Sequence, residues 1–241
     1  MYRKVRGKLA GLKKIVDYTR LAYLREMVRS VNRKNAVFIW IPKTAGTSLF
    51  SILNAPKLKN LHRLKYRFTG KGVVTFGHMD YARLIKEGYV SPSFDASAFK
   101  FAIVRNPYAR AVSLYSYLKR VGKLPTEQTF LTFCRGLRDE GCEPIGLFNT
   151  RLLSQCNPQV RWTENVEIQF IGKLESLDEA TRTILDRLEL PNVQVPQLNK
   201  SKHPTYPSVY CSESKEIVET FYKEDFLAFG YDFEDFPTQA P

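Results

Sequence analysis

Residues 42–48, Pro-Lys-Thr-Ala-Gly-Thr-Ser, combine groups that bind an anion: a mobile charge, two neighbouring hydroxyls and a glycine. An apolar run precedes them and a helical pattern follows from Leu49. The first backbone N–H groups of a helix have no partner in it and carry the positive end of its dipole, so this junction suits a phosphate-like group. The alternative is an ordinary strand-to-helix turn with a threonine cap. We expect the anion to be bound by Lys43, Thr44, Ala45, Gly46, Thr47 and Ser48.

This stretch is not a Walker A loop, because Lys43 precedes Gly46, whereas the Walker lysine follows the glycines. No apolar strand ends in an aspartate suited to Mg²⁺, and the three histidines and four cysteines lack the spacing of a zinc site. We therefore expect protein donors rather than a metal ion to bind the anion. Cys134 and Cys142 either pair or remain buried free thiols, and free thiols are favoured.

A second candidate anion site follows the apolar residues 98–104. Arg105 comes directly after them, and Asn106 and Pro107 are suited to begin a helix that carries Ser113 about two turns later. A guanidinium and a hydroxyl in this arrangement can bind a second phosphate. The alternative is an arginine that holds a carboxylate and a serine that bonds to its own helix. Arg110, on the same helix, is expected to face solvent.

His78 follows another apolar run, residues 72–77. Ligand sites in open parallel sheets collect at the carboxyl ends of strands. A histidine at such a position can take a proton from a substrate hydroxyl near neutral pH. A lone histidine is also a common structural residue, and both roles remain open here.

The elements that must position these groups form an α/β pattern. Apolar runs over residues 36–41, 72–77, 98–104 and 167–172 predict strands, the first of them central and parallel. Helices are expected over 126–137, 144–153, 177–188 and 212–229, the third with a capping box of Ser176 and Glu179. With 241 residues, 44% of them hydrophobic, the chain can bury one sizeable core. We expect one domain with a central, mostly parallel sheet flanked by helices.

Positive charge is concentrated at the N-terminus. Residues 1–34 hold eleven Lys and Arg against two acidic residues, a net +9 of the formal +13 of the whole chain. Apolar positions recur at helical spacing over residues 9–31. We therefore expect a basic amphipathic helix in residues 1–34 and the domain in residues 35–241. The helix either packs on the domain or makes a peripheral contact with an anionic membrane.

The two anion loops with a histidine between them resemble the PAPS-dependent sulfotransferases, whose donor is 3′-phosphoadenosine 5′-phosphosulfate. The resemblance is closest to the Golgi-type carbohydrate sulfotransferases and their bacterial relatives. Residues 42–48 match the 5′-phosphosulfate loop, and Arg105 with Ser113 matches the 3′-phosphate motif. Weaker matches are Gly77-His78, the junction at residues 170–175, and a late loop near the cofactor that includes Ser201 and Lys202. A P-loop-like sulfotransferase fold is implied.

The resemblance implies metal-independent transfer of a sulfuryl group from PAPS to an acceptor hydroxyl, with PAP as product. Lys43 would neutralise charge on the leaving oxygen, and His78 would remove the acceptor proton during in-line attack. Glu175 and Asp80 are the alternative bases. The favoured acceptor is a carbohydrate, with a small natural product or a lipid as alternatives, and no nucleic acid is expected as a partner.

Two other functions compete with this reading, a P-loop-like kinase or nucleotidase and a non-enzymatic polyanion binder. The displaced lysine argues against the kinase. The Golgi members carry an N-terminal membrane anchor, where this chain has a basic helix and no apolar run long enough to cross a bilayer. We therefore expect a cytoplasmic protein, with the Golgi lumen as the alternative if the chain lacks its native anchor.

Overall fold

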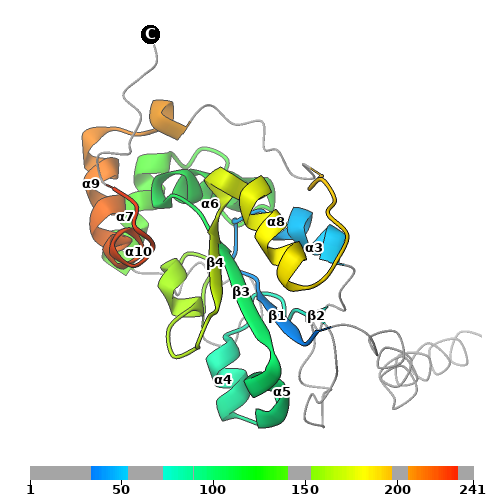
Figure 1. Ribbon diagram of the computed structural model, residues 1–241. Coiled ribbons are helices and arrows are strands. Elements are labelled where there is room, and N and C mark those ends of the chain that lie inside the picture. The colour runs from blue at the N-terminus through cyan, green and yellow to red at the C-terminus, as the bar shows by residue number, and fades with distance from the viewer. Residues whose placement is uncertain (1–33, 54–72, 89, 141–152, 197–205, 233–241) are drawn as a thin grey trace, which may run out of the picture.

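The computed structural model describes residues 34–53, 73–88, 90–140, 153–196 and 206–232 (Figure 1). Within these residues one sheet is formed by β1 (Ala36–Ile39), β2 (Val73–Val74), β3 (Phe99–Val104) and β4 (Phe170–Lys173). The strand order is β2-β1-β3-β4, and every pairing is parallel. This confirms the predicted α/β fold with a central parallel sheet.

The order of the strands reverses between β1 and β3. The chain leaves β1 for β2 at one edge and then crosses to β3 on the other side of β1. In open parallel sheets, ligands bind at such a switch point, beyond the carboxyl ends of the strands. The loops that follow β1 and β3 carry Lys43 and Arg105, so both cations lie at this position.

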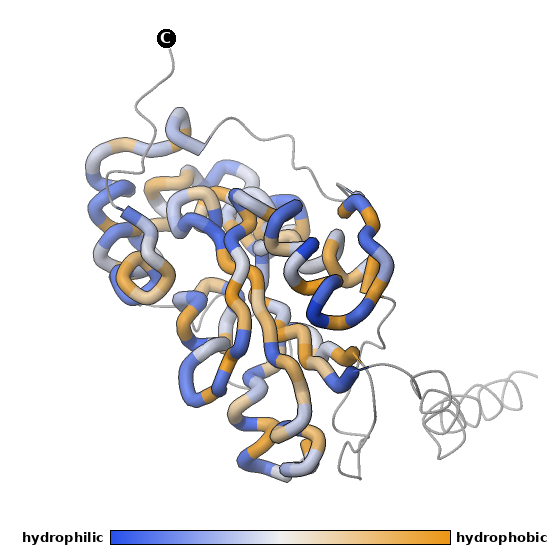
Figure 2. The backbone as a smooth tube through the Cα atoms, viewed as in Figure 1, coloured by the Kyte–Doolittle hydropathy of each residue, from blue (hydrophilic) through white to orange (hydrophobic). Residues whose placement is uncertain are grey.

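The central strands β1 and β3 are buried on both faces, which explains why they are almost wholly apolar. Val37 and Ile39 of β1 belong to one core cluster, whereas Phe38 and Trp40 belong to the other. Figure 2 shows β1 and β3 mostly in the orange of hydrophobic residues. Because successive side chains of a strand point to opposite faces, one apolar run supplies both clusters.

Helices cover the two faces unequally (Figure 1). One core cluster contains residues of α3 (Gly46–Leu53) and α8 (Leu177–Arg187). The other contains residues of α4 (Tyr81–Lys86), α5 (Pro92–Ser97), α6 (Pro107–Arg120), α7 (Phe130–Glu140), α9 (Ser212–Phe221) and α10 (Lys223–Phe229). Short 3₁₀ turns are η3 (Gln159–Trp162), η4 (Leu174–Ser176) and η5 (Tyr206–Val209).

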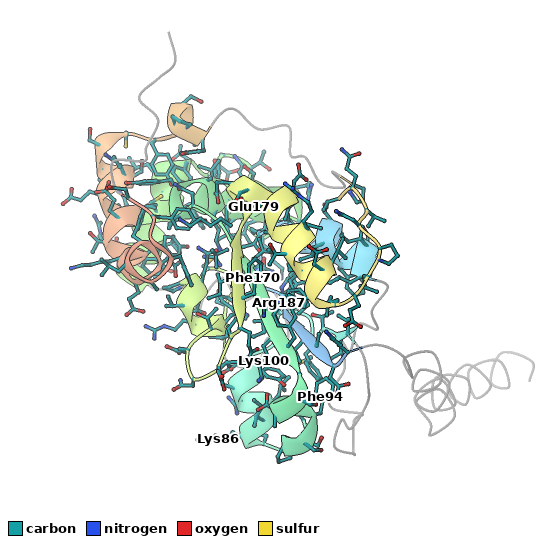
Figure 3. All side chains as sticks on the ribbon, viewed as in Figure 1. Lys86, Phe94, Lys100, Phe170, Glu179 and Arg187 are labelled. Carbon is teal, nitrogen blue, oxygen red and sulfur yellow. The ribbon has the colours of Figure 1, made fainter. Side chains whose placement is uncertain are left out.

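An ion pair between the buried Lys100 and the half-buried Asp95 lies at the amino-terminal end of β3, away from the strand ends that carry the two cations. Lys100 Nζ lies 3.4 Å from Asp95 Oδ1, and the hydroxyl of Tyr81 donates to the same oxygen at 2.9 Å. Lys100 is labelled low on β3 in Figure 3, toward α4 and α5. These contacts join α4 and α5 to each other and to β3.

Several predicted boundaries differ from the structure. The capping box at Ser176 was a wrong prediction, because the turn η4 precedes α8 and the Ser176 side chain makes no cap hydrogen bond. The helix expected over 212–229 is two helices that meet at Tyr222, which is buried and donates its hydroxyl to Cys156 O at 2.9 Å. The short helices α4 and α5 were not predicted, and α7 begins at Phe130 rather than Thr126.

Other expectations fall outside the described residues. These are the basic helix up to residue 33, nearly all of the helix expected over 144–153, Cys142, and the late loop with Ser201 and Lys202. Cys134 and Cys156 are buried free thiols. Among the helices that the structure describes, none has the length and apolarity that a membrane span requires.

Candidate functional site

The loop between β1 and α3 has an unusual backbone. Lys43 has φ 71° and Ala45 has φ 56°, a region that costs energy for residues other than glycine and that clusters at functional sites. The N–H groups of residues 44–47 donate to no group that the structure describes. The loop therefore presents a row of oriented donors at the N-terminus of α3, as the sequence predicted for an anion site.

The loop differs in two details from the predicted anion site. The N–H of Ser48 donates to Ala45 O at 2.9 Å, so this amide begins α3 and does not serve a ligand. A Cβ atom on Gly46 would lie 1.8 Å from Nε1 of Trp40, so the indole ring of Trp40 occupies the space beside this glycine, where a ligand could otherwise approach the backbone. Thr44 is buried and donates its hydroxyl to Ile41 O at 3.0 Å.

Lys43 belongs to a group of cations. Its Nζ lies 4.5 Å from the ring centroid of Tyr117, and Cζ of Arg120 lies 5.4 Å from the same centroid. Burial, followed by the charges of Arg120 and Arg105, lowers the pKa of Lys43 to about 8. Among the described residues, no carboxylate lies within 4.0 Å of these three cations. An anion bound here would relieve the repulsion between them.

Arg105 joins the second loop to the first. Its Nη1 donates to Lys43 O at 3.4 Å. Its backbone is fixed by Gln159, whose Oε1 accepts from Arg105 N at 2.9 Å and whose Nε2 donates to Arg105 O at 2.8 Å. Burial lowers the pKa of Arg105, and the nearby charge of Glu175 acts in the opposite direction.

The helix after Arg105 begins as predicted. Asn106 Oδ1 accepts from the N–H of Tyr108 at 3.0 Å, and Pro107 is the first residue of α6. Ser113 lies two turns along this helix and is buried. Its hydroxyl has no hydrogen bond to any described residue, which removes the alternative of a serine bonded to its own helix.

Arg110 is buried, so our expectation that it faces solvent was wrong: only 1% of its surface is exposed. Its guanidinium donates to Pro42 O at 3.1 Å, Asn157 O at 3.0 Å and Gln155 O at 2.8 Å. A guanidinium with five donors can hold several carbonyls at once. Arg110 therefore fixes the start of the first loop against residues 155–157. The sequence holds no signal for this role, because its partners lie 45 to 68 residues away.

His78 follows β2 and is held against β1. Its Nδ1 lies 2.8 Å from Trp40 O, and because a carbonyl oxygen only accepts, Nδ1 carries the proton of this bond. A neutral imidazole in this tautomer presents Nε2 as the proton acceptor. The indole of Trp162 donates to His78 O at 3.0 Å, which fixes the backbone of the histidine as well.

Both alternative bases already have partners within the chain. Asp80 caps α4, where its Oδ1 accepts from Arg83 N at 3.2 Å. Glu175 accepts from Asn106 N at 2.8 Å through Oε1 and from the hydroxyl of Tyr231 at 2.8 Å through Oε2. Both carboxylates thus accept hydrogen bonds from groups of the chain itself.

Comparison with known proteins gives a match to one family model and matches to several solved structures. The family model described as "Sulfotransferase family" matches residues 28–232. Mouse sulfotransferase SULT7A1 complexed with PAP is 12% identical with a TM-score of 0.53, over 88% of this chain and 94% of that chain. A sulfotransferase from Alicyclobacillus acidocaldarius is 16% identical with a TM-score of 0.49, over 85% of this chain and 98% of that one. No curated protein matches the chain. The likeness to the mouse protein supports the fold.

Proposed function

The chain belongs to the sulfotransferase family, and we propose that it transfers the sulfuryl group of PAPS to a hydroxyl of a carbohydrate acceptor. The observation that carries the choice of donor is the contact between the two loops, Arg105 Nη1 to Lys43 O at 3.4 Å. PAPS bears a phosphosulfate on its 5′ carbon and a phosphate on its 3′ carbon. Two adjoining anion sites match a donor with two anionic groups on one ribose.

The loop after β1 would bind the 5′ side. The N–H groups of residues 44–47 and the ammonium of Lys43 would surround the phosphosulfate. When the sulfuryl group leaves, charge grows on the oxygen that joined it to the phosphate. Lys43 would neutralise that charge, and each oriented donor of this kind contributes about 3 kcal/mol to stabilising a transition state.

The loop after β3 would bind the 3′-phosphate. Arg105 offers a planar guanidinium, and the buried Ser113 has a hydroxyl that bonds to no described residue. A guanidinium can make two parallel bonds to a phosphate, which gives geometric selectivity as well as affinity. This pair would distinguish PAPS from nucleotides that have no 3′-phosphate.

His78 would act as the base. The bond from Nδ1 to Trp40 O would orient the ring, and Nε2, which carries no proton in this tautomer, would accept the proton of the acceptor hydroxyl. General base catalysis of this kind contributes roughly 10²- to 10⁴-fold in rate. Trp40 lies three residues before Lys43, so the same short segment orients the base and carries the lysine.

The carbohydrate acceptor rests on the resemblance of residues 42–48, 105 and 113 to the Golgi-type enzymes. Arg120 adds a reason to favour an acceptor with negative charge, because it is exposed and extends the cationic surface outward from Lys43. Acidic glycans are therefore the first class to test, with neutral glycans, small phenols and lipids as comparisons.

The experiment is to incubate the protein with PAPS, EDTA and one acceptor at a time, and to measure the release of PAP. We expect release that depends on a glycan, is faster for acidic than for neutral glycans, and falls at least 100-fold in Lys43→Met. Release that requires Mg²⁺, or that is the same without any acceptor, would contradict the proposal. Release that depends on a phenol or lipid alone would retain the donor and replace the acceptor.

A further inference from the structure

The end of β4 is attached to the segment after α10 by two side chains. Lys173 Nζ donates to Gly230 O at 2.9 Å and lies 4.4 Å from the ring centroid of Tyr231. Two residues later, Glu175 Oε2 accepts from the Tyr231 hydroxyl at 2.8 Å. Gly230 has φ 59° and ends α10 in the left-handed conformation, which directs the chain toward β4.

The other carboxylate oxygen of Glu175 reaches the 3′-phosphate loop. Oε1 accepts from the N–H of Asn106 at 2.8 Å, across 69 residues of sequence. Asn106 is buried, and its own side chain is already used to cap α6. On the preceding residue, Gln159 holds both backbone groups of Arg105. Side chains from other segments thus bind three of the four backbone groups of residues 105 and 106, and the fourth, Asn106 O, accepts from Arg110 N at 2.9 Å.

We propose that Glu175 is a positioning residue for the 3′-phosphate site. Glu175 holds the site through the N–H of Asn106, and Tyr231 in turn sets the position of the Glu175 carboxylate. This inference rests on the proposed function. Bonds from an N–H group to a carboxylate are roughly twice as strong as neutral ones. Asn106 directly follows Arg105 and precedes the helix that carries Ser113. A shift of its N–H would therefore move both residues that are proposed to bind the 3′-phosphate. A small displacement of a binding group is enough to weaken the binding of its ligand substantially.

Glu175 is not required as a base in this account, because both its oxygens accept hydrogen bonds from within the chain. Its charge also lies near Arg105 without forming an ion pair, so it offsets part of the attraction of Arg105 for a phosphate. A glutamine at this position would keep the acceptor for Asn106 and remove that offset. If Glu175 acts by positioning, the alanine variant loses affinity for PAP and the glutamine variant keeps it. If only its charge matters, the two variants change the affinity in the same way.

The experiment compares the Kd of PAP with that of AMP, which has no 3′-phosphate, by calorimetry. Glu175→Ala is expected to weaken the binding of PAP about tenfold and the binding of AMP less than twofold, since the N–H of Asn106 loses its acceptor. Glu175→Gln is expected to bind PAP within threefold of wild type. Tyr231→Phe is expected to weaken the binding of PAP severalfold. Glu179→Ala, at an exposed position labelled on α8 in Figure 3, is the matched control and is expected to bind both as wild type does.

The contrary results separate two failures. A wild-type chain that does not bind PAP more tightly than AMP would contradict the proposed function itself. If the wild type does prefer PAP, equal weakening of PAP and AMP in Glu175→Ala, or a glutamine variant as weak as the alanine one, would overturn the positioning role. Thermal melts identify a variant that has unfolded, in which case Glu175→Gln and Tyr231→Phe decide.

Discussion

Nη1 of Arg105 and the carbonyl oxygen of Lys43 are 3.4 Å apart, so the loops that follow β1 and β3 contact each other at the point where the strand order reverses. The contact places the guanidinium of Arg105, which follows β3, against the loop that leads from β1 to α3. A ligand with two anionic groups a short distance apart could therefore contact both loops at once.

Binding of PAP is expected to weaken as the pH rises above about 8. The pKa of Lys43 is lowered to about 8, so the ammonium predominates at pH 7 and is lost as the pH rises through the pKa. A bound phosphosulfate or phosphate would raise that pKa again, and binding near pH 8.5 would take up a proton. Calorimetry of PAP binding at pH 8.5, in two buffers of different ionisation enthalpy, measures the uptake. Lys43→Met should abolish it, and absence of uptake in the wild type would contradict the assignment.

A second variant tests why the pKa of Lys43 is low. After burial, the charge of Arg120 is the largest cause, so Arg120→Ala should move the decline of PAP binding to higher pH. Lys123→Ala removes an equal charge from an exposed position three residues away and serves as the control. An equal shift in both variants would mean that net charge, rather than the place of Arg120, sets the profile.

Gly46→Ala is expected to destabilise the protein, because a Cβ atom there would lie 1.8 Å from Trp40 Nε1. Overpacking of this kind costs about 1 to 3 kcal/mol, and here the indole must move. Trp40 also provides the carbonyl that orients His78, so turnover should fall as well. Urea unfolding measures the first effect. Gly136→Ala in α7 is the control, with nothing within 4 Å of the added atom, and is expected to be neutral or stabilising by up to about 1 kcal/mol.

His78→Ala is expected to reduce kcat at least 100-fold and to leave the Kd of PAP within threefold, because the base acts on the acceptor and not on the donor. Asp80→Asn, which alters the neighbouring carboxylate but keeps an acceptor for Arg83 N, should retain most of the turnover. Steady-state release of PAP with a saturating acceptor measures kcat. Near-normal turnover in His78→Ala would exclude the histidine as the base.

The strands and the two anion loops were predictable from sequence for a physical reason. Apolar runs mark strands that are buried on both faces, and the residues directly after such runs must lie at the carboxyl edge of a parallel sheet. Lys43, His78 and Arg105 all follow runs of this kind. The runs that became β1 and β3 therefore placed Lys43 and Arg105 at one edge of the sheet before any contact was known.

The side chains that hold the loops were not predictable in the same way. Arg110, Gln159 and Glu175 bond to carbonyls and N–H groups that lie 45 to 69 residues away. Backbone acceptors look alike at every position, so no residue type marks the partner of Arg110. The packing of Trp40 on Gly46 was equally hidden, since a glycine after a strand has the same appearance whether a ligand or a ring approaches it.

The most direct test of the donor assignment is calorimetric titration with PAP and, separately, with ADP, both in EDTA and both repeated on Arg105→Ala. The two ligands have the same number of phosphates in different places, so their difference measures recognition of the 3′-phosphate. We predict metal-free binding of PAP at least tenfold tighter than that of ADP, with the preference lost in the variant. Equal binding of the two ligands by the wild type, or no binding of either, would contradict the PAPS-dependent sulfotransferase.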